Sequence, residues 1–241
     1  MAKSPHPDIE MLQIIAKAFG DLNEKMVFVG GATTTLYIDD EGSPESLATV
    51  DIDCTLELSS ALSFEDLEKE LALRGFKHPM VPDEPAPMCR YIYKGIEVDV
   101  MPSDPKYIGF SNVWYPEGIK NRIKVTLPNG EKIHVFALPF FLATKIEAMK
   151  SRGGKDLRFS HDLEDIILIL SGCSTVLSQL ESAPKHLHAF LKKEISGMLK
   201  NPYFKEAVGT ALFSNGEDVV RRDRVIMLVS KFVGTVVRRK S

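Results

Sequence analysis

Residues 49–58 read TVDIDCTLEL, a run of β-branched and apolar residues that predicts a strand carrying two acids. Successive side chains of a strand point to opposite faces, so Asp51 and Asp53 would project from the same side. Two like charges on one side repel each other unless a cation lies between them, and Mg²⁺ prefers carboxylate oxygens. The stretch therefore indicates a divalent-cation site, with an exposed edge strand whose acids face water as the alternative.

A glycine pair precedes this strand. The short apolar run from Met26 to Val29 predicts a buried strand, and Gly30-Gly31 closes it. Glycines between a strand and a helix let the backbone approach a phosphate, which the positive end of the helix also attracts. Gly30, Gly31 and Thr33 are therefore candidate phosphate ligands, and a tight turn requiring the same glycines is the alternative.

A third segment, Ile96–Met101, predicts another strand with acids on one face. Asp99 stands between two valines, and Glu97 lies two residues before it on the same side. Taken alone, this pattern is typical of a hairpin with a polar face. Its interest lies in the order of the three segments along the chain: a glycine turn, two acids on one strand, and a further acid on another.

The rest of the pattern predicts an α+β body followed by a helical region. We expect two domains, a sheet with flanking helices over residues 1–137 and helices over residues 138–241. The expected elements before Leu138 are helices at 8–19, 32–38 and 63–73, a loop at 79–87, and hairpins at 90–101 and 122–136. After Leu138 we expect a helix from Pro139 to about Ser151, another from Asp162, and helices to the end.

Composition excludes several classes of protein. With 241 residues, 44% of them apolar and 26% charged, the chain is unlike disordered, collagen-like or disulfide-stapled proteins. No apolar run approaches the roughly 20 residues that cross a bilayer, and no secretory signal is evident, so no membrane partner is expected. Three widely spaced cysteines without a C-x-x-C pattern predict a cytoplasmic location.

Charge is divided unevenly along the chain. Residues 174–241 hold 12 Lys and Arg against 6 Asp and Glu, whereas residues 1–173 hold 18 against 27. A basic tail on an acidic body is consistent with a polyanionic partner, and equally with basic residues that only solvate helix faces.

The glycine turn, the paired acids Asp51 and Asp53, and the separate Asp99 resemble, in that order, the nucleotidyltransferase superfamily of the DNA polymerase β type. The resemblance implies a mixed sheet and an enzyme that moves a nucleoside monophosphate from a nucleoside triphosphate to an acceptor hydroxyl, releasing pyrophosphate. The three acids would hold two Mg²⁺ (or Mn²⁺) ions, which stabilise the entering and leaving oxygens. Asp99 would lie nearest the attacking oxygen, and Gly30 and Gly31 would contact the triphosphate.

The helical region narrows the resemblance. Residues 138–152 and 161–166 look like the K-x-x-A … D-x-x-D pattern of the AbiEii-like nucleotidyltransferases, a family of toxins of toxin–antitoxin pairs with many relatives. In that family Lys145, Asp162 and Asp165 would belong to the active-site region. Lys145 would be a mobile charge that neutralises the β and γ phosphates, and the two aspartates would orient Lys145 or meet the acceptor. A solvated lysine and acids that favour a first helical turn are the alternatives.

One position departs from the family pattern. Relatives commonly carry Arg-x-Thr ahead of the paired acids, whereas this chain has Leu47-Ala48-Thr49. The resemblance then implies that another cation replaces that arginine or that the substrate specificity differs.

The resemblance leaves the acceptor open. RNA fits the basic tail and the toxin-like relatives favour tRNA, while a protein hydroxyl and a small molecule are the other acceptors considered. An antitoxin is a further partner that the resemblance implies. Two other functions compete with the leading one: a catalytically silent relative that serves as a binding module, and a small-molecule nucleotidyltransferase of the antibiotic-modifying kind.

Overall fold

The computed structural model describes residues 6–58, 62–80, 87–152, 156–212 and 219–235. The chain divides into two compact units, residues 1–33 with 47–137, and residues 34–46 with 138–241. The first unit carries a six-stranded mixed sheet with helices, and the second is built from helices. The α+β fold class expected from the sequence is therefore confirmed.

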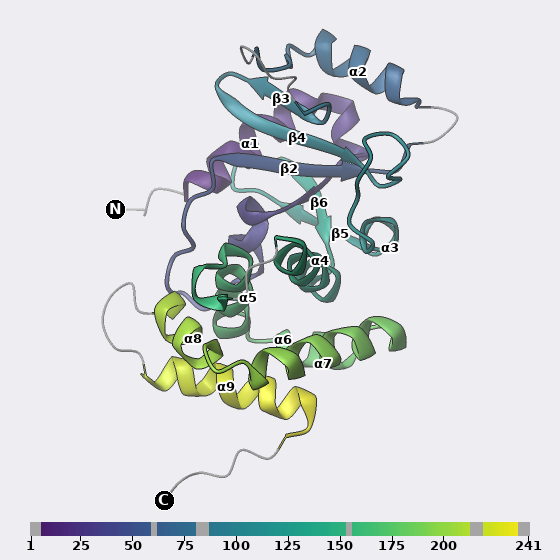
Figure 1. The fold of residues 1–241 in the computed structure, drawn as a ribbon. Coiled ribbons are helices and arrows are strands. Elements are labelled where there is room, and N and C mark those ends of the chain that lie inside the picture. Colours follow the sequence, from purple (N-terminus) through teal and green to yellow (C-terminus); the bar gives the residue numbers. More distant parts are fainter. Residues whose placement is uncertain (1–5, 59–61, 81–86, 153–155, 213–218, 236–241) are drawn as a thin grey trace, which may run out of the picture. The chain divides into compact units, whose positions relative to one another are not determined.

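The sheet of the first unit places its acidic strands away from the edges. Its strands follow the order β3-β4-β2-β1-β6-β5, and Figure 1 shows β3, β4 and β2 side by side. Strand β2 pairs in parallel with β4 and antiparallel with β1, and β1 pairs in parallel with β6. The strands are β1 (Val27–Val29), β2 (Asp51–Leu56), β3 (Arg90–Tyr93), β4 (Ile96–Pro102), β5 (Arg122–Thr126) and β6 (Lys132–Phe136).

The hairpin of β3 and β4 has its register fixed by a two-residue turn. Lys94 and Gly95 both have positive φ angles, 49° and 84°, as the tightest hairpin turns require. From this turn the pairing runs from Tyr93 opposite Ile96 to Arg90 opposite Asp99. The turn therefore decides which side chain stands opposite the third acid.

The two expected α-helices of the first unit lie within one residue of their predicted bounds, and two short helices, η1 (Gly20–Glu24) and α3 (Tyr115–Lys120), were not predicted. In α1 (Pro7–Phe19) the apolar stripe of Leu12, Ile15 and Phe19 is buried, and η1 follows it. In α2 (Phe64–Leu73) Ser63 and Asp66 form a capping box that satisfies free backbone N–H groups.

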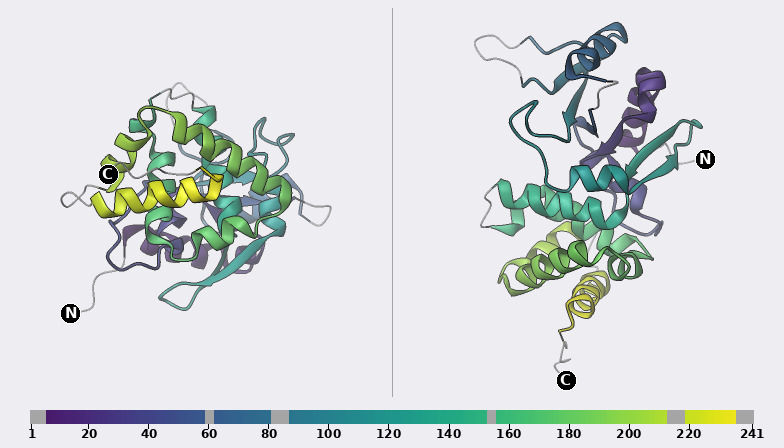
Figure 2. Two further views of the ribbon diagram at one scale, coloured as in Figure 1. Left: turned by 90° about the horizontal axis from the view of Figure 1, so that it is seen from below. Right: turned by 90° about the vertical axis from the view of Figure 1, so that its right-hand side faces the viewer.

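The second unit is built around two helices that are apolar on most sides. These are α4 (Leu138–Ser151) and α5 (His161–Gly172), which pack against each other. The short η3 (Leu157–Phe159) lies between them along the chain. Figure 2 shows α9 lying beside α7 and α8. The remaining helices are α6 (Val176–Glu181), α7 (Lys185–Lys200), α8 (Phe204–Leu212) and α9 (Val219–Val233). None of the helices in the described ranges is long and apolar enough to cross a membrane.

Two details of the structure differ from expectation. The helix expected at 32–38 is a 3-10 helix, η2 (Gly31–Tyr37), in which three consecutive β-branched threonines resist a regular α-helix. Residues 34–46, expected in the first domain, belong to the second unit. They are held there because the backbone N–H groups of Asp39 and Asp40 donate to Gly172, and the side chain of Asp39 accepts from Ser174. Residues 81–86 of the expected loop and residues 213–218 and 236–241 of the basic region lie outside the described residues.

Candidate active site

Four carboxylates lie on one face of the sheet, on the neighbouring strands β2 and β4. Parallel pairing sets Asp53 beside Asp99 and Asp51 beside Glu97. Paired residues of neighbouring strands project from the same face, so the three acids singled out in the sequence lie on one side. We call Asp51, Asp53, Glu97 and Asp99 the acid face. Because β2 has a partner strand on each side, the alternative of an exposed edge strand is wrong.

Gly30 lies directly against the acid face. It directly follows β1 with a φ of +75°, and a Cβ atom on it would stand 2.0 Å from Oδ2 of Asp53. Only glycine accommodates both this backbone conformation and this close approach. Thr33 closes the turn, since its N–H and its hydroxyl both donate to the carbonyl of Gly30, at 3.3 and 3.0 Å. The glycine turn that the sequence predicted beside the acids is therefore in place.

Arg90 of β3 is bonded to two of the four carboxylates. Its Nε and Nη2 donate to the two oxygens of Asp99 at 2.8 and 2.7 Å, and its Nη1 lies 3.0 Å from Oε2 of Glu97. The hydrogen bonds to Asp99 raise the pKa of Arg90, and the charges of Glu97 and Asp51 add to that rise. Arg90 is therefore a permanent cation held among the acids, in the two-pronged geometry that suits guanidinium and carboxylate.

Burial and the negative charge of the acid face raise the pKa of two neighbouring cysteines. Burial raises the pKa of Cys54, and the charges of Asp53 and Asp99 raise it further. Burial likewise raises the pKa of Cys89 to about 11, with Asp99 again contributing. Both thiols are therefore protonated and unreactive at neutral pH. Asp51 accepts a hydrogen bond from the hydroxyl of Thr49 at 2.8 Å.

The acid face has the chemistry of a hard-cation site. Carboxylate oxygens are the ligands that Mg²⁺ takes in proteins, and Gly30, which has no Cβ, leaves room for the carboxylate of Asp53 beside the turn. Over the described part of the chain, no three His, Cys, Asp or Glu side chains are arranged to hold a metal ion as they stand. Asp99 is engaged by Arg90, whose side chain is 31% exposed. Asp51, Asp53 and Asp99 are nevertheless suitable ligands for such a cation, because they are carboxylates and lie on the same face of paired strands.

The second unit has its own ion cluster, formed by α4 and α5. Nζ of Lys145 lies 2.6 Å from Oδ2 of Asp165 and 3.4 Å from Oδ1 of Asp162. Nη1 of Arg152 pairs with Oδ2 of Asp162 at 2.5 Å. We call Lys145, Arg152, Asp162 and Asp165 the helix cluster. The three residues that the sequence brought forward from this region therefore do lie together.

Lys145 is not the solvated lysine that the sequence left open as an alternative, because it is only 8% exposed and Asp162 only 3%. The contact of Lys145 with a phosphate stays a prediction. A lysine stem can extend along an apolar helix face, and α4 is apolar enough for its amine to be buried with two acidic partners. Arg152, which the sequence did not bring forward, completes the charge balance.

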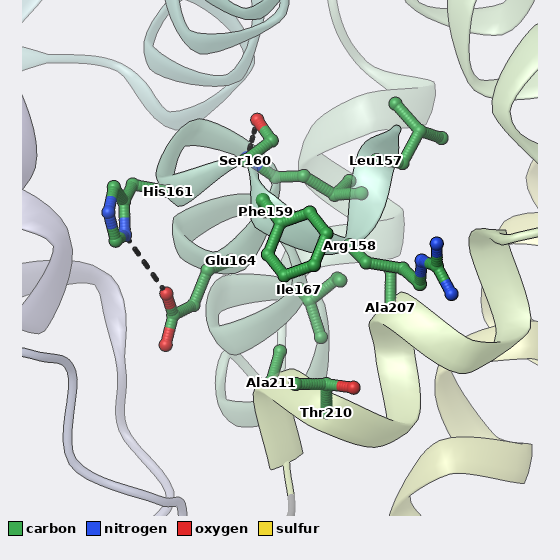
Figure 3. Close-up of a pocket in the computed structure, with 11 residues that line it drawn as sticks. Leu157, Arg158, Phe159, Ser160, His161, Glu164, Ile167, Ala207, Thr210 and Ala211 are labelled. Atoms are coloured by element: carbon green, nitrogen blue, oxygen red, sulfur yellow. Dashed lines mark hydrogen bonds and ion pairs between the residues drawn. The ribbon is translucent and has the colours of Figure 1, made fainter. Parts of the chain in front are cut away.

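A cavity of about 210 Å³ lies elsewhere in the second unit, between the start of α5 and α8 (Figure 3). The ring of Phe159 stands over Ile167, and the side chains of His161 and Glu164 point to one side and contact each other at 3.4 Å. Its lining includes none of the residues singled out from the sequence. It carries no chemistry that we can assign.

Sequence reasoning missed Arg90 as well as Arg152, although a signal for Arg90 was present. A two-residue turn at Lys94-Gly95 fixes the pairing of the hairpin, and counting back four residues on each side places Arg90 opposite Asp99. The parallel pairing of β2 with β4 has no such local signal, because their connection spans a helix and a hairpin strand.

No protein-family model and no curated protein matches the chain. The likeness to nucleotidyltransferases therefore rests on the residues and their placement alone.

Proposed function

We propose that the chain is a Mg²⁺-dependent or Mn²⁺-dependent nucleotidyltransferase, which moves a nucleoside monophosphate from a nucleoside triphosphate to an acceptor hydroxyl. The observation that carries the proposal is the register of β2 and β4, which sets Asp51, Asp53 and Asp99 on one face beside a glycine turn. This is the arrangement expected of a site that brings a divalent cation to a phosphate.

Each part of the acid face has a role in the proposal. Asp51, Asp53 and Asp99 would hold the divalent ions, which supply charge neutralisation for the entering and leaving oxygens when bound. Asp99 would also accept the proton of the attacking hydroxyl. The backbone of Gly30 and Gly31 would approach the triphosphate, which no residue with a Cβ at position 30 would permit.

The roles of the helix cluster in the proposal rest on the family resemblance alone. Contact of Lys145 with the triphosphate is a prediction that rests on the resemblance, and so is a contact of Asp162 or Asp165 with the acceptor. The proposal for the acid face does not depend on either. RNA, with tRNA as its leading candidate, is the proposed acceptor, because the chain from residue 174 onward carries an excess of basic residues.

A catalytically silent binding module is the second candidate, and Arg90 is the observation that favours it. A guanidinium bonded to both oxygens of Asp99 already neutralises that acid. If the pair persists in the presence of Mg²⁺ and nucleotide, the third ligand is lost and transfer fails. The two candidates therefore differ in whether Asp99 becomes available.

Transfer of label from nucleoside triphosphates tests the proposal. The purified chain is incubated with each of the four α-³²P-labelled triphosphates, total cellular RNA and Mg²⁺ or Mn²⁺, and products are separated by size. We expect one triphosphate to label an RNA band, and EDTA to abolish the labelling. A chain that labels neither RNA, protein nor itself with any triphosphate would favour the silent module.

Matched aspartate variants connect the activity to the site. Asp53→Asn keeps the shape of the side chain and removes its charge, so we expect at least a hundredfold loss of labelling. Asp104→Asn is the control, because Asp104 follows the end of β4 and forms an exposed ion pair with Lys106. Equal labelling by the two variants would contradict a catalytic acid face.

A further inference from the structure

The guanidinium of Arg90 occupies the position in the acid face where a divalent cation would bind carboxylates of the same acids. Its guanidinium contacts both oxygens of Asp99 and one oxygen of Glu97. A bidentate guanidinium occupies one lone pair on each oxygen of the carboxylate and places a positive charge beside it, which opposes the approach of a metal ion to the same oxygens. Arg90 and a metal ion therefore compete for Asp99.

We propose that Arg90 is a built-in competitor for the divalent cation, so that the site exchanges between an Arg90-paired form and a metal-bound form. The inference rests on the proposed function, because it concerns the same acids. It assigns Arg90 a positioning role: the guanidinium sets how much metal is needed before Asp99 is released.

The exposure of the three side chains makes such an exchange feasible. Arg90 is 31% exposed, Glu97 42% and Asp99 14%, so the guanidinium has a path to solvent and is not enclosed. An ion pair with this much contact with water is weak enough to be broken by a doubly charged ion. The helix cluster is different, since Lys145 and Asp162 have side-chain exposures of 10% and 4%.

In the absence of metal, only the molecules in which Arg90 is not paired with Asp99 can bind the ion. The apparent metal affinity is therefore the intrinsic affinity multiplied by the fraction of such molecules. If Arg90 pairs with Asp99 in about nine molecules of ten, its removal raises the apparent affinity about tenfold. Removal also leaves the acids without their guanidinium, so the metal-free protein should lose stability while the metal-bound protein should not.

Mn²⁺ titration followed by the electron paramagnetic resonance signal of free Mn²⁺ tests the inference in the full chain. Arg90→Gln keeps a polar side chain and removes the charge. Arg74→Gln is the matched control, because Arg74, at the end of α2, also pairs with two carboxylates of the first unit, Glu70 of α2 and Asp21 of η1. We expect Arg90→Gln to bind Mn²⁺ about tenfold more tightly than the wild type and Arg74→Gln to bind as the wild type does.

Thermal unfolding with and without Mn²⁺ gives a second readout that needs no catalysis. We expect Arg90→Gln to melt below the wild type without metal and to gain more from saturating Mn²⁺. Arg90→Lys keeps the charge but cannot bond both oxygens of Asp99, so its melting temperature and its gain from Mn²⁺ should lie between those of the wild type and Arg90→Gln. This variant replaces Arg90→Gln in the test if the glutamine variant does not fold.

The outcomes separate this inference from the proposed function. Equal or weaker Mn²⁺ binding by Arg90→Gln, together with loss of binding in Asp53→Asn, would overturn the competition and leave the metal site standing. Absence of Mn²⁺ binding in the wild type and in both Arg90 variants would overturn the metal site and the competition together. Binding by Arg90→Gln but not by the wild type would support the competition in its strongest form.

Discussion

The acid face and the helix cluster both place cations among carboxylates, yet they differ in charge balance and in contact with water. The acid face has four carboxylates and one guanidinium, on strands that leave Glu97 42% exposed. The helix cluster has two acids and two cations, and Lys145 and Asp162 are buried. The charges of the helix cluster balance around the buried Lys145 and Asp162, although Arg152 is 71% exposed, whereas the acid face keeps an excess of negative charge in contact with water, which favours an added cation. The acid face is therefore the better candidate for cation binding.

Replacement of Lys145 should give the largest loss of stability. Lys145→Met keeps the length of the side chain and leaves Asp165 and Asp162 without this partner in a buried setting. We expect the free energy of unfolding to fall by about 3 kcal/mol, measured by urea denaturation. Lys69→Met is the control, since Lys69 forms an exposed pair with Glu65 one turn away and should change little. A stability loss no larger than that of the control would break the comparison.

A methyl group at Gly30 should affect both stability and the acid face. Gly30→Ala places a Cβ against Asp53 and also requires a positive φ, so we expect a loss of about 2 kcal/mol in the free energy of unfolding and weaker Mn²⁺ binding. Gly130→Ala separates the two causes, because Gly130 has a φ of +88° and open space around it. The control should lose about 1 kcal/mol and bind Mn²⁺ normally. Normal binding by Gly30→Ala would show that Asp53 does not need this close approach.

His134 should give the smallest effect, a pH dependence of stability that belongs to neither cluster. Burial, helped by the charge of Arg122, lowers the pKa of His134 below its usual 6.5. As pH falls through 6.5 the unfolded chain takes up this proton while the folded chain does not, so the free energy of unfolding decreases toward acid. His134→Gln should show a shallower decrease between pH 7 and 5 in urea denaturation series. An unchanged slope would mean that carboxylates, not His134, govern this range.

Local patterns predicted much of the fold. An apolar stripe placed α1, a proline in the first turn placed α4, a serine with an acid three residues on placed the start of α2, and turn residues placed both hairpins. The assignment of residues 34–46 to the second unit was out of reach, because it depends on hydrogen bonds between Asp39 and the far end of α5.

The candidate site was predictable in its acids and not in their surroundings. The two-residue period of a strand placed Asp51 and Asp53 on one side without any tertiary information. The charge balance of the acid face depends instead on Arg90, through its contact with Asp99, and that of the helix cluster on Arg152, through its contact with Asp162. Burial of Lys145 was equally hidden, since a lysine on a helix is exposed unless the packing around that helix supplies acids.

Diffraction from crystals of the chain soaked in Mn²⁺, recorded near the manganese absorption edge, tests the metal site most directly. We predict an anomalous peak bounded by carboxylate oxygens of Asp51, Asp53 and Asp99, with the guanidinium of Arg90 displaced from Asp99. A crystal without a peak at these acids, in which Arg90 still bonds both oxygens of Asp99 at saturating Mn²⁺, would contradict it.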